Sequence, residues 1–189
     1  MSKITYGICN LHYAKKTIGE DGAVTFAAPV AMPGASEMTL DPVGETTPVW
    51  ADNTKYVNIV SNQGYEGSVT VYGLPEAFCT DILGMVKDAK GVMVENADAV
   101  QAEFALLGEF ASETAEKKRW GMYNCTGGRP AVAGKTKEEN VEAQAHQIDI
   151  TASPLEGTGD VQASIVGTDT DATFKDWFKA VYTPSAMEG

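Results

Sequence analysis

The most reactive side chains in this sequence are two histidines and three cysteines, and their spacing builds no recognisable reaction centre. His12 and His146 could each act as a general base, but each is a lone histidine in an expected strand. Cys9, Cys79 and Cys125 form no C-x-x-C pair, so a zinc site would need ligands from distant segments. The G-x-S-x-G, P-loop, H-E-x-x-H and dinucleotide-binding glycine motifs are missing from the sequence. We therefore predict a protein that is not an enzyme and uses no cofactor or metal, with structural histidines and small buried thiols.

Two short charged motifs have simpler interpretations than ligand binding. Asp169-Thr-Asp171 resembles the start of a calcium loop, but the glycine and the terminal glutamate of such a loop are missing at the required spacing. We expect these residues to begin a helix instead. Lys117-Lys-Arg119 is a basic run in an acidic chain, and we expect it to be solvated at the start of a strand rather than to bind nucleic acid.

The composition is that of an acidic globular protein. The 189 residues include 14 Lys and Arg against 26 Asp and Glu, which gives a net charge of −12. A surface that holds DNA or RNA through its phosphates needs clustered Lys and Arg, so such a role is disfavoured. No apolar run reaches the roughly 18 residues of a membrane span, and the first residues lack the apolar region of a signal peptide. We expect a soluble chain, made in a cytoplasm, that does not bind a membrane.

Alternation of apolar and polar residues is the dominant period, and it predicts β-strands. In the segment 37–41, for example, Met38 and Leu40 share one face of the strand while Glu37, Thr39 and Asp41 share the other. Expected strands cover residues 4–13, 23–26, 37–41, 56–60, 65–72, 91–95, 103–111, 118–125, 141–153 and 160–166. The predicted fold class is α+β, mainly β: two packed antiparallel sheets, a sandwich or barrel, in a single domain over residues 1–189.

Two short helices complete the predicted fold. The first follows residue 74, with a proline in its first turn, Phe78 and Ile82 on one face, and a glycine at its end. The second covers residues 173–181, where Thr173 and Asp176 form a capping box. Its apolar residues follow the spacing i, i+3, i+4, i+7 of an amphipathic helix.

Residues 42–54 interrupt the strand pattern. Pro42, Gly44 and Pro48 are unsuited to a regular strand ladder. A dozen unpatterned residues within a compact domain are more often functional than not. We therefore expect an irregular functional loop that carries Trp50. Together with the acidic, β-rich composition, this loop favours a structural or interaction protein.

Five strings occur in one order along the chain: Leu40–Thr54, Asn62–Gly67, Val94–Ala97, Tyr123–Thr126 followed by Arg129 and Pro130, and Trp177–Pro184. Together they resemble the major tail proteins of long-tailed bacteriophages, and the phi13-type major tail protein is the nearest group. The resemblance runs over almost the whole chain, from about residue 4 to residue 184.

This resemblance implies a tail tube protein, with the architecture that contractile phage tubes and type VI secretion tubes share. Each subunit is expected to be a β-sandwich with a flanking helix, and six subunits form a ring whose inner sheets join into one barrel. Rings stack into a tube, and a long hairpin loop near the first third of the chain joins successive rings together with the chain ends. Residues 42–56 match that loop in position and length. The contact residues predicted there are Pro42, Val43, Gly44, Glu45, Thr46, Pro48, Val49, Trp50 and Tyr56.

The strands that flank this loop are expected to line the lumen, because the loop must emerge at the rim of the ring. An acidic lumen would repel DNA, which carries about one negative charge per 1.7 Å of axis. Alternation of apolar and polar residues along a strand does not show whether the polar face meets the lumen or the water outside the tube. The assignment to the lumen therefore rests on the loop and on the resemblance. The residues predicted to line the lumen are Glu37, Thr39, Asp41, Glu66, Ser68, Thr70 and Asp149.

The expected partners are other copies of the chain, the tape-measure protein and DNA in the lumen, and terminator and distal tail proteins at the tube ends. The expected location is the virion tail, assembled in the cytoplasm of the bacterial host. One alternative is a tail-completion or neck (terminator) protein. Another is a β-sandwich module that binds a carbohydrate or a receptor, which would favour aromatic residues grouped on one face. Trp50, Trp120 and Trp177 are instead dispersed among a loop, a strand and a helix.

Overall fold

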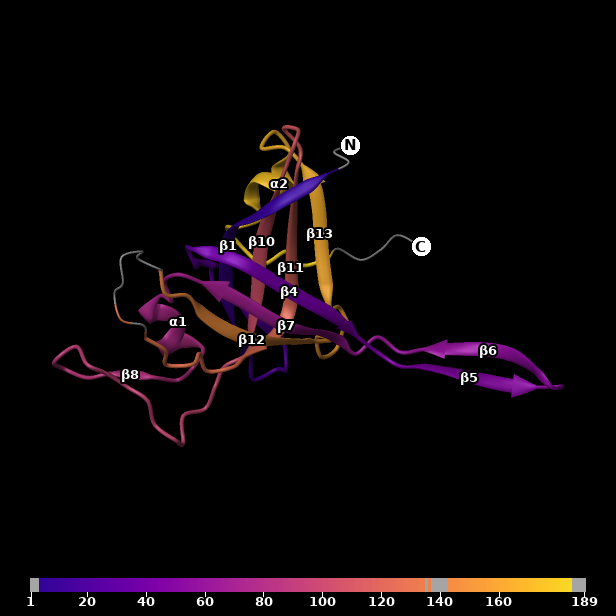
Figure 1. The fold of residues 1–189 in the computed structure, drawn as a ribbon, viewed down its shortest axis with the longest axis horizontal. Helices are drawn as coiled ribbons and strands as arrows, with labels where there is room; N and C mark the ends of the chain where they lie inside the picture. Colours follow the sequence, from indigo (N-terminus) through magenta and orange to yellow (C-terminus); the bar gives the residue numbers. More distant parts are fainter. Residues whose placement is uncertain (1–3, 135, 137–142, 185–189) are drawn as a thin grey trace.

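The computed structural model describes residues 4–134, 136 and 143–184, and this part of the chain is mainly β-structure with two short helices (Figure 1). The helices are α1 (Glu76–Asp81) and α2 (Ala172–Asp176). The strands are β1 (Thr5–Ile18), β2 (Val24–Phe26), β3 (Val30–Ala31), β4 (Ala35–Val43), β5 (Thr46–Ala51), β6 (Thr54–Val60), β7 (Gly64–Val71), β8 (Val86–Lys87), β9 (Met93–Val94), β10 (Phe104–Ser112), β11 (Lys117–Gly127), β12 (His146–Ser153) and β13 (Gln162–Gly167). The predicted fold class, α+β and mainly β, is confirmed. The strand predicted from residue 141 begins at His146, and residues 141 and 142 lie outside the described residues.

Nine strands form the largest sheet, in the order β2-β1-β10-β11-β12-β7-β4, with β13 and β3 attached as branches. Its strand pairs are antiparallel. The sheet divides at β11, because residues 117–122 of this strand pair with β13 while residues 124–127 pair with β12. One layer therefore continues into β13 and the other into β12, β7 and β4, which cross in front of β10, β11 and β13 in Figure 1.

The two layers enclose the larger of two buried clusters, as expected for a sandwich, and the smaller one contains Ala14, Leu107 and Trp177. Val69 of β7 and Ile148 of β12 belong to the same buried cluster as Phe104 and Leu106 of β10. The large sheet does not close into a barrel, because β4, at the end of the strand order, pairs only with β7 among the described residues. The barrel that was one form of the predicted fold is therefore not present in the single subunit.

Helix α1 closes one end of the core and has the face predicted for it. Phe78 and Ile82 are fully buried. The Phe78 ring meets Tyr13 and Phe104 edge-on, with ring centroids 5.1 Å and 5.6 Å apart. The Tyr13 hydroxyl donates to an Asp81 carboxylate oxygen at 3.1 Å, so the helix is joined to β1 by both apolar and polar contacts.

Helix α2 is shorter than predicted and begins at a different residue. Its N-cap is Asp171 rather than Thr173, and the helix ends at Asp176, so the predicted capping box is wrong. The reason is local: the Asp171 carboxylate accepts a hydrogen bond from the Thr168 backbone N–H at 3.2 Å, and this turn sets the start of the helix. The acidic motif does begin a helix, as expected. Trp177, just beyond α2, is buried, and its Nε1 donates to the Trp120 carbonyl oxygen at 3.3 Å.

Candidate functional site

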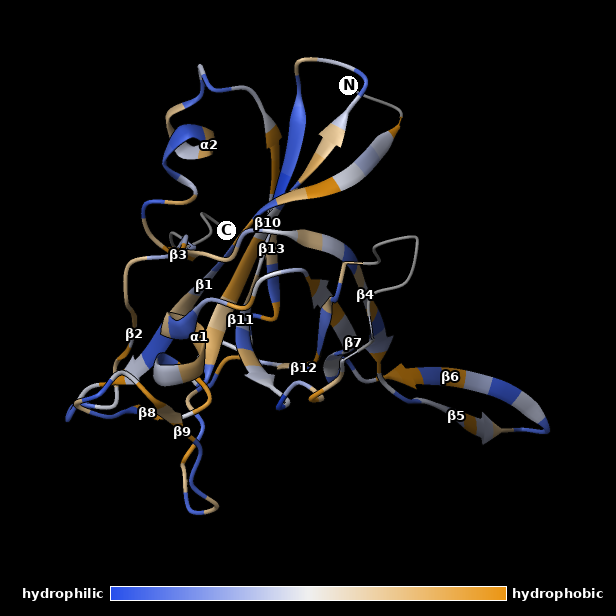
Figure 2. Ribbon diagram, turned by 60° about the vertical axis from the view of Figure 1, so that its left-hand side comes forward, coloured by the Kyte–Doolittle hydropathy of each residue, from blue (hydrophilic) through white to orange (hydrophobic). Residues whose placement is uncertain are grey.

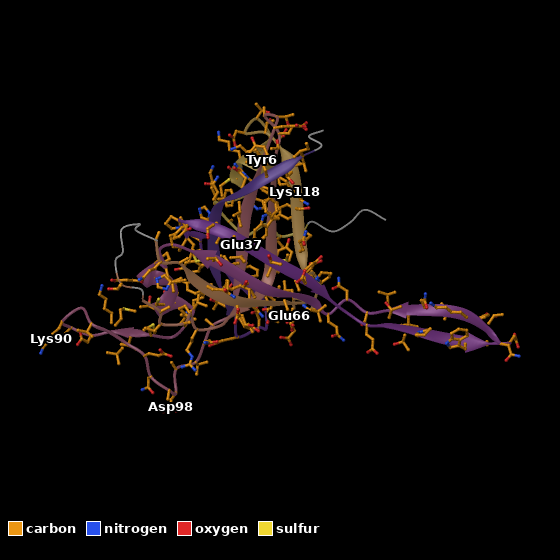
Figure 3. All side chains as sticks on the ribbon, viewed as in Figure 1. Tyr6, Glu37, Glu66, Lys90, Asp98 and Lys118 are labelled. Atoms are coloured by element: carbon orange, nitrogen blue, oxygen red, sulfur yellow. The ribbon has the colours of Figure 1, made fainter. Side chains whose placement is uncertain are left out.

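Three adjacent strands bring the predicted lumen residues together on one face. Strand β7 lies between β4 and β12, and the two registers align residues of all three strands in rows. Successive rows of one face are two residues apart. The rows are Glu37–Thr70–Gln147, Thr39–Ser68–Asp149 and Asp41–Glu66–Thr151. We call these nine residues the polar face; Figure 3 labels Glu37 on β4 and Glu66 on β7.

The opposite side of the same strands faces the core, so the alternation predicted from the sequence is confirmed. Met38, Val69 and Ile148 form a row there, and Val69 and Ile148 are fully buried. The next row contains Gly67, where a side chain is excluded because a Cβ atom would lie 1.9 Å from the Thr39 carbonyl oxygen. The core therefore fixes which side chains β4, β7 and β12 present outward.

The polar face carries four carboxylates and no cation. None of its three strands contains Lys or Arg. Among the described residues, none of the carboxylates of Glu37, Asp41, Glu66 and Asp149 forms an ion pair. The Asp149 carboxylate accepts a 3.5 Å hydrogen bond from the Gln147 side chain. Asp41 and Glu66 are direct cross-strand partners, an arrangement of like charges that destabilises a sheet. The fold alone gives no reason for this arrangement.

Sequence reasoning left three residues out of the set of predicted site residues. Gln147 and Thr151 share rows with predicted members. Thr126 of β11 pairs with Thr151 and is exposed, so it extends the polar face onto a fourth strand. The expected strand 118–125 stopped one residue short of Thr126. Continuing its alternation would have found this residue.

The segment that its residue pattern predicted to be irregular is an extended β-hairpin, so that prediction is wrong, whereas the hairpin that the family resemblance implied is present. Strands β5 and β6 pair from Thr46 opposite Val60 to Ala51 opposite Thr54. A two-stranded ribbon leaves one edge of each strand unpaired, and a proline such as Pro48 is tolerated at an edge. The two turn residues, Asp52 and Asn53, have φ angles of 50° and 59°. Both angles positive is the geometry of a type I′ turn, which closes two-residue hairpins.

This hairpin, residues 44–63, projects from the body of the protein, and we call it the arm (Figure 1). It continues β4 and β7 directly, because Val43 and Gly64 are the last pair between them. The close approach at its root requires a glycine, since a Cβ on Gly44 would lie 2.2 Å from the Ser61 carbonyl oxygen. Of the predicted contact residues, Pro42 and Val43 end β4, Gly44 and Glu45 form the root, Thr46, Pro48, Val49 and Trp50 belong to β5, and Tyr56 belongs to β6.

The arm exposes more apolar surface than a free hairpin should. Trp50 is 66% exposed and Tyr56 is 75% exposed. The register puts Val49, Val57 and Ile59 on one face of the ribbon, and all three are exposed. No arm residue belongs to the two core clusters of the described chain, and the arm side chains stand clear of the body in Figure 3. Exposed apolar surface of this kind marks an interaction site. In Figure 2 the most hydrophobic residues of this ribbon are coloured orange.

The reactive residues singled out in the sequence do not gather into a centre. The described residues contain no group of three or more His, Cys, Asp or Glu side chains placed to hold a metal ion. His12 stacks on Phe178 with ring centroids 4.6 Å apart. Cys125 is buried and Cys9 and Cys79 are half-buried, and all three are free thiols. No helix in the described part of the chain is both long and apolar enough to cross a membrane.

The basic run 117–119 is only partly solvated, which corrects the prediction for Arg119. This side chain is buried beneath the segment that follows β13, with its guanidinium carbon 3.8 Å from the centre of the Phe174 ring. A buried acid on the neighbouring strand, Glu109, holds it there. Sequence reasoning did not single out Glu109, although it is the one charged residue of β10.

One comparison with known proteins identifies the family of the chain. A family model described as phage tail tube protein matches residues 1–180. No curated protein matches the chain. The matched span includes the polar face, the arm and both helices. This family is a structural class of virion tail components rather than a class of enzymes. The chain belongs to the phage tail tube protein family.

Proposed function

We propose that this protein polymerises as stacked hexameric rings to form the tail tube of a long-tailed phage, of the phi13-type group. The observation that carries the proposal is the position of the arm relative to the polar face. Both are built from β4 and β7, so the apolar arm leaves the subunit at the end of its acidic sheet. A tube subunit needs one surface for the inner wall and, at the end of that wall, a second surface that contacts the next ring. The polar face would supply the first and the arm the second.

The ring is proposed to close by joining the inner layers of six subunits into one barrel. Strand β4 supports this step, because it is nine residues long and pairs along only one edge in the described chain. A long unpaired edge is a template for pairing with another chain. Such a barrel would be too wide for side chains to fill, since diameter grows with strand number, and it would leave a channel.

The polar face is proposed to line that channel and to act by repulsion. Six subunits of −12 each carry −72 formal charges per ring. Unpaired carboxylates in the wall give DNA no fixed counter-charge to hold, so the genome can slide during ejection. The repulsion is of short range, because the Debye length is about 8 Å at physiological ionic strength. It therefore acts on DNA that approaches the wall.

The arm is proposed to join successive rings, with Trp50 as its anchor. Aromatic side chains that become fully buried carry much of the binding energy of protein interfaces. Trp50 is the exposed member of the three tryptophans, since Trp120 and Trp177 are buried. This distribution disfavours a carbohydrate-binding platform, which needs several exposed aromatic residues on one face.

The remaining partners follow from this role. The tape-measure protein and DNA occupy the lumen in turn, and terminator and distal tail proteins bind the two ends of the tube. Assembly takes place in the cytoplasm of the host, and the product is part of the virion tail.

Negative-stain electron microscopy of the purified protein tests the proposal. Tubes of uniform width with a stain-filled channel are the expected result. Single rings that do not stack would favour the terminator alternative. Monomers at all concentrations would favour a binding module and would contradict a tube.

A further inference from the structure

A second apolar feature lies at the other end of the sheet that carries the arm. It is a pocket of about 330 Å³ lined mainly by the α1 region and by the segment that follows β11. Its lining includes Leu74, Cys79, Leu83, Met85, Pro130 and Val132. The lining also includes His146, the first residue of β12, which pairs with Val71 at the end of β7. We call this the α1 pocket.

We propose that the α1 pocket receives the Trp50 end of the arm from a second copy of the chain in the adjacent ring. The inference rests on the proposed function, because it needs stacked rings. The inference names the surface that receives the arm, which neither the sequence nor the family match assigns.

The first argument is the direction of the subunit, because the arm and the pocket lie at opposite ends of it. The arm leaves β7 at Gly64, and the α1 pocket lies beyond Val71 at the other end of the same strand, roughly 25 Å away along the backbone. Figure 1 shows the arm and α1 at opposite ends of the molecule. A copy displaced along the strand direction therefore places its arm towards the pocket of its neighbour. The two surfaces differ, so the contact is heterologous and repeats without closing, as a tube requires.

The second argument is chemical fit. The pocket is at the small end of the range of ligand sites, a size suited to one aromatic side chain rather than a large ligand. Its rim carries one charge of each sign, because Arg129 and Glu95 form an exposed ion pair at 2.6 Å. The arm also carries both signs beside its indole. Lys55 is the cross-strand partner of Trp50, and Asp52 follows two residues later. Both members of the rim pair can therefore find partners on the arm.

The third argument excludes a larger apolar groove. A groove of about 400 Å³ lies between the two layers and is lined by Leu40, Tyr65 and Trp120, among others. Tyr65 pairs with Pro42 beside the root of the arm, so this groove lies at the same end of the sheet as the arm itself. A copy displaced along the strands carries its arm away from this end. The α1 pocket instead lies at the end of the sheet that the arm of a displaced copy approaches.

Photo-crosslinking tests the pocket directly. The photoreactive residue p-benzoylphenylalanine replaces Trp50 in an isotope-labelled chain, which is assembled as a minor component into tubes of the unmodified chain. The expected crosslinks join labelled to unlabelled chains and map by mass spectrometry to residues 74–85 or 129–133. The same residue placed at the exposed position Val166 of β13 serves as the control and should not give these crosslinks. Tubes whose position-50 crosslinks map elsewhere would overturn the inference and leave the proposed function intact.

Filling the pocket gives an independent test that does not use the arm. Ala131→Trp places an indole in the lining from an exposed position, and Val166→Trp adds the same side chain at an exposed position of β13, a strand that contributes no residue to the lining. We expect the first variant to need at least tenfold more protein to form tubes and the second to assemble like the wild type. Both should keep the wild-type melting temperature as monomers. Normal assembly of a folded Ala131→Trp variant would overturn the inference, whereas a wild-type chain that never forms tubes would instead overturn the proposed function.

Discussion

Arg119 lies directly opposite Glu109 in the ladder between β10 and β11, and its Nε donates to Glu109 Oε2 at 2.7 Å with both side chains buried. The other carboxylate oxygen, Oε1, accepts hydrogen bonds from Lys117 Nζ at 3.0 Å and Asn10 Nδ2 at 3.1 Å. Arg119 Nη1 also donates to the Phe174 carbonyl oxygen. This network connects three strands to α2. Glu109 is the one buried carboxylate among the described residues.

Replacing Glu109 with alanine should lower the free energy of unfolding by roughly 3–5 kcal/mol, because it leaves Arg119 buried without its partner. Removing both side chains should lower it by less than the sum of the two single changes, since neither charge is then left alone. Urea unfolding of the unassembled subunit measures both effects. Lys179→Ala, which breaks an exposed ion pair with Asp176, is the control and should have little effect. A Glu109→Ala variant as stable as the wild type would contradict the role given to this pair.

The same network should make stability depend on pH. Burial alone would raise the pKa of Glu109, but hydrogen bonds and charge from Arg119 and Lys117 outweigh it and hold this pKa below its ordinary value. The pKa is therefore lower in the folded chain than in the unfolded chain. Such a group contributes its full stabilisation above the unfolded pKa and loses it as the pH falls through the folded pKa.

We therefore expect the urea midpoint of the wild type to fall on acidification below about pH 4.5, with a smaller fall for Glu109→Gln. Equal slopes for the two proteins across this range would show that Glu109 is not the titrating group.

The sequence predicted the polar face well because strand alternation is a local property. A buried core on one side of Glu37–Asp41 requires polar residues on the other, and the same holds for the segment 65–72. What alternation could not supply is the register that joins three strands separated by many residues into one face. The four acids of the polar face can be recognised as one set only when the register of the three strands is known, for example from the row Thr39–Ser68–Asp149.

The arm was predicted less well, for a physical reason. Proline, glycine and turn residues argue against a strand inside a sheet, but a free ribbon has an unpaired edge where these residues are tolerated. Pro48 and the Asp52-Asn53 turn are compatible with a hairpin for this reason. The buried pair of Glu109 and Arg119 could not be predicted either, since it depends on which distant segment covers β10 and β11.

Removing the arm should separate assembly from folding. A variant in which a short Gly-Ser turn replaces residues 45–61 removes no member of the described core clusters. We expect a folded monomer with the thermal stability of the wild type that forms no tubes by electron microscopy. A variant with the single change Trp50→Ala should assemble only at higher protein concentration, because it loses the anchor and keeps the ribbon. Normal tubes from the arm-deleted chain would contradict the role of the arm.

Reversing the charge of the polar face should affect DNA passage rather than assembly. In Glu37→Lys/Glu66→Lys/Asp149→Lys, the new side chains remain on the exposed face of β4, β7 and β12, so tubes should still form. Ejection from virions that carry this variant should be slower, because lysines in the wall attract the phosphates. The delay should shrink as salt rises, since screening shortens the attraction. Ejection is followed by the fluorescence of a DNA dye outside the particle.

A matched control separates this local effect from net charge. Glu20→Lys/Asp98→Lys/Glu156→Lys changes the total charge by the same amount at exposed positions outside the polar face. If the polar face lines the lumen, only the polar-face variant slows ejection and this control does not, because only the lysines of the polar face meet the DNA along the channel. Equal ejection rates for the two variants at low salt, or a tube map with Glu37 and Glu66 on the outer wall, would show that another surface lines the lumen. A salt-independent delay would instead point to a steric obstruction, because a charge effect must weaken with screening.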